Sequence, residues 1–203
     1  MATRIRHDIF IASTIGDLRD ARETVARAVM GVGEFPILVE RFAPSIEPAK
    51  AVIENAIATS DVFLLVMGTR GGTYTEAGDQ TFTEYEYQCA LRYSKPILAL
   101  LPSEEKFQRD SILAGESQEQ KRRVAEFRRM LSVSRHAVAY YADVEDLADR
   151  VFQLLPEIIA RLAALPPNTD TLELSFGNDA TVEFIIVELD ALQKIYTTLC
   201  ELA

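Results

Sequence analysis

The sequence is poor in metal-binding and redox-active side chains, with two cysteines and two histidines among its 203 residues. Cys89 and Cys200 lie far apart in apolar, helix-patterned segments, which favours buried, reduced thiols over a disulfide framework. His7 and His136 are too few to complete a zinc site, because such sites need four clustered nitrogen or sulfur ligands. These shortages argue against a disulfide-stabilised protein and against metal chemistry.

Long apolar runs are absent as well. No segment reaches the roughly 18 apolar residues of a membrane span, and the polar start MATRIRHD lacks the apolar core of a signal peptide. Acidic residues outnumber basic ones by 31 to 21, giving a formal net charge of -10, which disfavours binding to nucleic acid or anionic membranes. We therefore expect a cytoplasmic protein with no membrane or nucleic-acid partner.

Strand-like and helix-like patterns alternate along most of the chain. Short apolar runs typical of strands cover residues 8–14, 37–39, 61–68, 95–101 and 136–141. Amphipathic stretches typical of helices cover residues 17–30, 48–59, 83–95, 117–131 and 143–165. Ser117 and Gln120 have the spacing of a capping box. The polar residues 103–116 are interpreted as a connection.

This alternation predicts a doubly wound α/β domain with a five-stranded parallel sheet, because consecutive parallel strands need helical crossovers. We expect the flavodoxin-like strand order 2-1-3-4-5. The run DVFLLVMG is apolar on both faces, as in a central strand covered by helices on both sides. Ligands of such sheets bind beyond the C-terminal strand ends where the strand order reverses. Here those ends are residues 13–16 and 68–72.

The domain boundary is expected near two consecutive prolines. Residues 1–165 form the main domain, and residues 166–170, with Pro166 and Pro167, form a linker. Residues 171–203 are expected to form a β-hairpin around GND and a closing helix. Such a piece is too small to fold well alone, so it packs on the main domain, contacts another chain, or begins a further domain.

Two carboxylates, Glu84 and Glu86, follow the glycine-rich loop GTRGGTY. The loop amides, including those of Gly68 and Gly71, could cradle phosphates, but the loop is neither a P-loop nor a GxGxxG motif. Carboxylates near a helix N-terminus are electrostatically stabilised, so capping is an alternative to catalysis for both. Residues two apart on a helix point about 200° from each other, so at most one of the pair faces the cleft.

Other polar side chains at the same edge also have two interpretations. Ser13 and Thr14 end the first strand, where their hydroxyls could bind phosphate or ribose or cap a helix. Asp17 is an N-cap candidate. Arg70 is a candidate phosphate ligand or a solvated loop charge. Tyr74 stacks on a base or packs on the scaffold.

Three phrases carry a family resemblance: IFIASTIGDLRDAR, SDVFLLVMGTRGGTY and FTEYEYQCALRYSKPILALL. In order and spacing they resemble a TIR-like family, the domain of unknown function 4062, over about residues 8–160. The last phrase is also similar to the helix of NAD-cleaving TIR domains and nucleoside deoxyribosyltransferases, in which a catalytic glutamate precedes a lysine and often a proline. Glu86 lies nine residues before Lys95 and ten before Pro96, so the resemblance implies the catalytic role for Glu86 rather than Glu84.

The resemblance implies a TIR-like fold and cleavage of an N-glycosidic bond, with NAD or a related nucleotide as the substrate and no cofactor. Glu86 would stabilise the positive charge that develops on the ribose, or trap the sugar covalently. Arg22 is then a structural ion-pair partner, and Glu84 pairs with Arg70 to hold the loop. The substrate-binding candidates are Ser13, Thr14, Gly68, Arg70, Gly71, Tyr74 and Thr83, with Asp17, Arg22 and Glu84 in supporting roles.

Three functions stay open at this stage, since a fold does not decide a function. The first is NAD cleavage by an effector of bacterial antiphage or innate immune signalling, acting as a homo-oligomer or with a fused or associated sensor domain. The second is a non-catalytic module for self-assembly or protein interaction. The third is an enzyme similar to nucleoside deoxyribosyltransferases.

Overall fold

The computed structural model describes residues 6–42, 48–113, 115–164, 171–176 and 180–185. The chain divides into two units, Met1–Leu162 and Ala163–Ala203. The strands of the first unit are β1 (Asp8–Ser13), β2 (Phe35–Ile37), β3 (Val62–Val66), β4 (Ile97–Pro102) and β5 (Ala137–Tyr141). Its α-helices are α1 (Ile15–Gly31), α2 (Ala49–Thr59), α3 (Phe82–Arg92), α4 (Glu104–Leu113), α5 (Gln118–Ser132) and α6 (Val144–Ala164).

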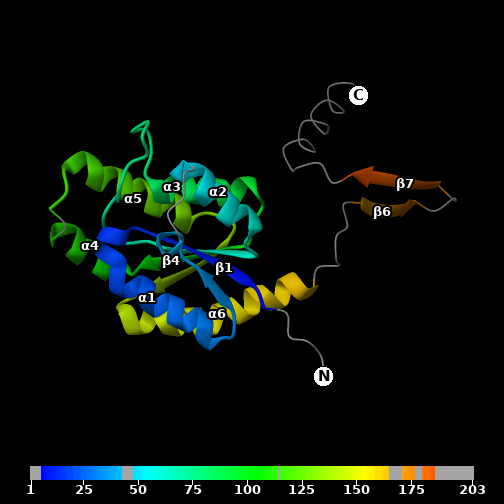
Figure 1. Cartoon of the computed structure of the whole chain (residues 1–203), viewed down its shortest axis with the longest axis horizontal. Coiled ribbons are helices and arrows are strands. Elements are labelled where there is room, and N and C mark those ends of the chain that lie inside the picture. Colours follow the sequence, from blue (N-terminus) through cyan, green and yellow to red (C-terminus); the bar gives the residue numbers. More distant parts are fainter. Residues whose placement is uncertain (1–5, 43–47, 114, 165–170, 177–179, 186–203) are drawn as a thin grey trace. The chain divides into compact units, whose positions relative to one another are not determined.

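The strands form one parallel sheet in the order β2-β1-β3-β4-β5 (Figure 1). This confirms the predicted strand order and the doubly wound α/β fold. Every residue of β3 is buried, as its lack of polar alternation predicted. Ser13, the last residue of β1, pairs with Val66, the last residue of β3. The two strand ends at which the strand order reverses therefore lie side by side.

Each face of the sheet has its own core. Helices α1 and α6 cover one face, where Ile9, Ile11, Leu64 and Leu100 point toward them, and α2, α3 and α5 cover the other (Figure 1). The second core stacks Phe10 on Phe63, with ring centroids 5.6 Å apart. Side chains alternate between the two faces along each strand, so both faces are apolar and both need a helical cover.

The predictions failed at several element boundaries. Helix α1 begins at Ile15, with Thr14 rather than Asp17 at the N-cap position. Strand β2 lies two residues before the predicted 37–39, because residues 39–41 turn into the 3-10 helix η1 (Val39–Arg41). Pro36 is tolerated in β2 because it is an edge strand.

Helix α4 was missed altogether, since it was interpreted as a connection. It buries one apolar residue, Phe107, so it has no apolar periodicity for the sequence to show. Local polar contacts support it instead: Ser103 Oγ accepts from the Lys106 N–H at 3.3 Å, and Lys106 pairs with Asp110 one turn later at 2.7 Å. The capping box predicted for α5 at Ser117 and Gln120 is confirmed.

The second unit contains the antiparallel strands β6 (Thr171–Phe176) and β7 (Ala180–Ile185). Their antiparallel pairing agrees with the expected hairpin, and the GND segment itself lies outside the described residues. The predicted linker at residues 166–170 and the predicted closing helix lie outside the described residues.

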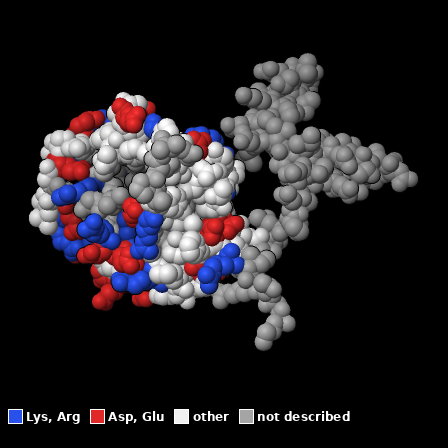
Figure 2. Space-filling view, in the orientation of Figure 1, with Lys and Arg blue, Asp and Glu red and all other residues white. Residues whose placement is uncertain are grey.

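Acidic and basic side chains are interspersed over the first unit on the face shown in Figure 2. That face therefore presents no uniformly basic surface of the kind that binds a nucleic-acid backbone. Among the described helices none is both long and apolar enough to cross a membrane.

Candidate functional site

A cleft of about 560 Å³ opens beyond the C-terminal ends of β1 and β3. Its polar lining comes from segments far apart in sequence. Ser13 is the last residue of β1 and Thr14 follows it, while Arg22 lies in α1 and Glu86 in α3. The apolar lining is Ile11, Val39, Ala49, Ile53 and Phe82. Cofactor and substrate sites have volumes of roughly 300 to 1,000 Å³ and mostly apolar walls, so this cleft has the size and lining of a small-molecule site.

Glu86 lies in the second turn of α3, with its side chain partly exposed to this cleft. Within the described ranges, its carboxyl group makes no hydrogen bond or ion pair. Burial raises the pKa of Glu86 to about 8, with the positive charge of Arg22 opposing the rise and the negative charge of Glu40 adding to it. An unpartnered carboxyl group of raised pKa in a cleft is typical of a functional group.

Arg22 lies under the same cleft and is 6% exposed. Its Nε and Nη2 donate to the two carboxylate oxygens of Glu40 at 3.0 and 2.6 Å, and Nη1 donates to Ser13 Oγ at 2.8 Å and to the Ile11 carbonyl at 3.3 Å. This two-point contact is the strong form of an arginine–carboxylate pair. The predicted role of Arg22 as an ion-pair partner is confirmed, and its partner is Glu40.

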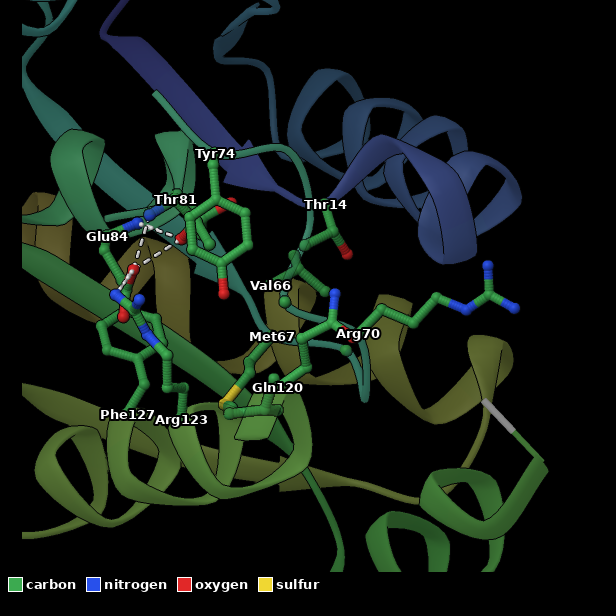
Figure 3. A pocket seen from close by; sticks show the side chains of 14 residues that line it. Thr14, Val66, Met67, Arg70, Tyr74, Thr81, Glu84, Gln120, Arg123 and Phe127 are labelled. Carbon is green, nitrogen blue, oxygen red and sulfur yellow. Dashed lines mark hydrogen bonds and ion pairs between the residues drawn. The ribbon is translucent and has the colours of Figure 1, made fainter. Parts of the chain in front are cut away.

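Glu84 faces a different space. Its carboxylate accepts from the Thr81 N–H at 2.6 Å, while the Glu84 N–H donates to Thr81 Oγ1 at 3.2 Å, which completes a capping box at the start of α3. Arg123 of α5 lies 3.6 Å from the same carboxylate. The predicted pairing of Glu84 with Arg70 is wrong, and Figure 3 shows the Arg70 guanidinium directed away from Glu84.

A second, much smaller cavity of about 30 Å³ lies beside Glu84 (Figure 3). Tyr74 stands across it, with the Arg123 guanidinium 5.1 Å from the centre of the Tyr74 ring. The predicted ligands Gly68, Gly71 and Tyr74 line this cavity, and Thr14, Arg70 and Thr83 border both spaces. The predicted set is therefore divided between two spaces, and the larger contains Glu86. A water-sized cavity is too small for a nucleotide base.

The loop that separates the two spaces is held at several points. The carboxylate of Glu116 accepts from the Gly71 N–H, with oxygens at 3.2 and 3.3 Å. The buried Tyr141 hydroxyl donates to the Met67 carbonyl at 2.7 Å, where β3 passes into the loop. These bonds order the backbone that borders the cleft.

Two charged residues of the cleft lining were not predicted from the sequence: Glu40 and Glu116. Both lie outside the three phrases of the family resemblance, Glu40 in a short 3-10 helix and Glu116 in a connection. A lone glutamate in such a segment looks like any solvated surface charge, so no local signal could have identified them.

Lys95 lies away from the cleft and contacts the scaffold. Lys95, whose spacing from Glu86 matches the resemblance, precedes β4 at the sheet edge opposite the cleft. Its Nζ donates to the carbonyls of Ala58 and Ser60, each at 2.7 Å. Its role here is to hold the end of α2. Among the described residues, no cluster of histidine, cysteine and carboxylate side chains could hold a metal ion.

The fold and the cleft define a doubly wound α/β domain with an unpartnered carboxyl group at its topological switch point. Residues 8–156 match the family described as domain of unknown function (DUF4062), and the chain belongs to that family. Comparison with curated proteins gave no match.

Two solved structures are among those similar to the chain. One is a CMP N-glycosidase, BcmB, of Clostridium botulinum, with 16% identity over 71% of this chain and 96% of that one and a TM-score of 0.44. The other comprises the TIR domains of the activated Roq1 resistosome, with 13% identity over 75% of this chain and 99% of that one and a TM-score of 0.49. At these identities and scores, likeness says nothing of activity.

Proposed function

We propose that the cleft around Glu86 cleaves the N-glycosidic bond of NAD or a related nucleotide. The observation that carries this proposal is the Glu86 carboxyl group itself, which is half-buried, makes no hydrogen bond or ion pair among the described residues, and borders a cleft of about 560 Å³. A carboxyl group that serves only the fold is normally paired or fully solvated. Glu86 is neither.

The chemistry requires a carboxylate beneath the sugar. The bond between ribose C1′ and the pyridinium nitrogen breaks, and its electron pair stays on the nitrogen, so nicotinamide leaves as a neutral molecule. Positive charge develops on the ribose, where ionised Glu86 stabilises it or bonds to C1′ transiently. Water then adds to C1′ and releases a proton to solvent, which gives ADP-ribose.

A cationic leaving group suits the groups that border the cleft. Cleavage of a pyridinium nucleotide needs no proton donor, because the departing ring is neutral once it holds the electron pair. A neutral base would need protonation, and neither His7 nor His136 borders the cleft among the described lining residues. A pyridinium cation would also favour the ionised form of Glu86 by direct attraction.

The family resemblance is what supports the proposed biological setting. The proposed role is that of an effector in bacterial antiphage or innate immune signalling that consumes NAD after assembly into a homo-oligomer or activation by an associated sensor domain.

The test is to incubate the purified full chain with NAD between pH 7 and pH 9, dilute and concentrated, and to follow nicotinamide and ADP-ribose. Glu86→Gln should lower the rate at least about 100-fold, as removal of one transition-state stabiliser does. Glu84→Gln is the matched control, because glutamine also completes a capping box, and it should keep the wild-type rate within about threefold.

Wild-type protein that releases no nicotinamide at any concentration would support the interaction module instead. Transfer of deoxyribose from a nucleoside to a free base, without cleavage of NAD, would support the deoxyribosyltransferase-like alternative.

A further inference from the structure

Glu40 is the second carboxylate of the cleft and differs from Glu86 in how it is bound. Both oxygens of Glu40 accept from Arg22, and the Glu40 side chain is 37% exposed against 8% for Arg22. The third guanidinium nitrogen of Arg22 donates to Ser13 and Ile11 on β1. The Arg22 guanidinium thus directs all three of its nitrogens to β1 and Glu40.

We propose that Glu40 is a positioning residue: it binds and neutralises Arg22, and thereby removes from the cleft the positive charge that would otherwise favour the ionised form of Glu86. Arg22, Glu40 and Glu86 border the same cleft. Since Arg22 and Glu40 carry opposite charges, Glu86 faces a pair of zero net charge. Without Glu40, it would face the uncompensated positive charge of Arg22, and an opposite charge nearby favours the ionised carboxylate.

The other groups around Glu86 do not replace this pair. Arg70, in the loop after β3, and Glu116, in the connection between α4 and α5, also border the cleft and carry opposite charges. Helix α2 contributes only Ala49 and Ile53 to the lining, and neither titrates. On α3 itself Cys89 lies one turn after Glu86, and its pKa is raised, chiefly by burial. The other titratable groups near Glu86 on α3 do not border the cleft: Glu84, Tyr85 and Tyr87. Burial of Glu86 and the negative charge of Glu40 therefore both raise the pKa of Glu86, and the positive charge of Arg22 lowers it.

The surface offers a matched control pair. Arg41 of η1 pairs with Glu23 of α1, so it joins the same two elements as the Arg22–Glu40 pair. Both side chains of the control pair are about half exposed, at 51% and 48%, and neither borders the cleft. Glu23→Gln removes one carboxylate and one ion pair between the same elements without changing the charge beside Glu86.

The experiment is a carbon-13 NMR titration of the Glu86 side-chain carboxyl carbon, assigned by its loss in the Glu86→Gln protein. Glu40→Gln should lower the pKa of Glu86 by at least about 1, the effect of one uncompensated opposite charge at close range. Glu23→Gln should leave the midpoint within about 0.3 pH of wild type, a margin of roughly a third of the expected effect. An unchanged midpoint in Glu40→Gln, or an equal change in Glu23→Gln, overturns the proposal.

A second variant keeps the proposal testable if Glu40→Gln fails to fold. Arg22→Gln removes the cation and leaves the negative charge of Glu40, so the midpoint should move in the opposite direction, to higher pH. A fall or no change in that variant also overturns the proposal. The double variant Arg22→Gln with Glu40→Gln should lie between the two single variants.

The consequence for catalysis rests on the proposed function. If Glu86 must be ionised to cleave NAD, Glu40→Gln should move the pH–rate profile to lower pH by the same amount as the NMR titration. The two proposals can fail independently of each other. The titration tests the role of Glu40 without any turnover, and nicotinamide release by the wild-type protein tests the proposed activity.

Discussion

Gly72 lies directly against Thr14: a Cβ atom at Gly72 would be 2.8 Å from Cγ2 of Thr14. Gly72 also has a φ of 77°, in the left-handed region that glycine adopts without steric cost. Thr14 follows β1 and Gly72 lies in the loop after β3. This contact therefore joins the two loops that border the cleft, and it depends on the absence of a side chain at residue 72.

Gly72→Ala should destabilise the protein and reduce the proposed NAD cleavage. The left-handed conformation alone costs about 1 to 2 kcal/mol for an alanine, and the methyl group must also displace Thr14 and the loop. Gly78→Ala is the control, since Gly78 has a similar φ of 71° with nothing within 4 Å of the added Cβ. Urea unfolding should show the larger loss for Gly72→Ala, and equal losses would mean that the Thr14 contact contributes nothing.

Lys95→Met should destabilise the fold without changing the chemistry. The substitution leaves the Ala58 and Ser60 carbonyls without their 2.7 Å donor, and an unsatisfied buried group costs about 1 to 3 kcal/mol. Because Lys95 precedes β4 at the edge opposite the cleft, kcat/KM for the proposed NAD cleavage should stay within about twofold, the spread expected without a lost transition-state contact.

Lys121→Met is the control for Lys95→Met, because Lys121 Nζ has no hydrogen-bond or ion-pair partner among the described residues. It should leave the free energy of unfolding nearly unchanged. A loss of kcat/KM in the folded Lys95→Met protein would place Lys95 in the chemistry rather than in the scaffold.

The sequence predicted the elements whose signal is local or strongly periodic. The run that became β3 shows no polar alternation, and the Ser117–Gln120 spacing marked the start of α5. Helix α4 was missed because Phe107 is its one buried residue. Packing decides such an element, and packing is not visible in a single segment.

The site was predictable only in part, for the same reason. Glu86 borders the cleft and Glu84 borders the small cavity, as expected of residues about 200° apart on one helix. The expected cleft residues Gly68, Gly71 and Tyr74, however, line the cavity beside Glu84. The family resemblance implied the catalytic role for Glu86, because of the spacing between Glu86 and Lys95. The partner of Arg22 was not predictable, since Glu40 is 18 residues away in a 3-10 helix, and only the fold brings the two together.

Glu86→Gln should stabilise the protein at alkaline pH while it removes the proposed activity. Burial raises the pKa of Glu86 from 4.5 to about 8 in the folded protein, so folding favours the protonated form. In the wild type, the contribution of protonated Glu86 to the free energy of unfolding is fully present below pH 4.5, and it is lost as the pH rises through about 8. Glutamine has a similar size and cannot ionise, so the stability of the variant does not fall over this pH range for this reason.

The measurement is urea unfolding of wild type and Glu86→Gln at pH 5, 7 and 9, with Glu84→Gln as the control for loss of a carboxylate from α3. Relative to wild type, Glu86→Gln should gain at least about 1 kcal/mol between pH 5 and pH 9, because each unit of pKa difference corresponds to about 1.4 kcal/mol. A scaffold carboxylate would give the opposite result, since its loss would remove a favourable contact. A gain in stability together with loss of NAD cleavage is the combination expected of a residue kept for chemistry at the expense of the fold. If Glu86→Gln is less stable than wild type at pH 9, then Glu86 serves the fold and the catalytic assignment fails.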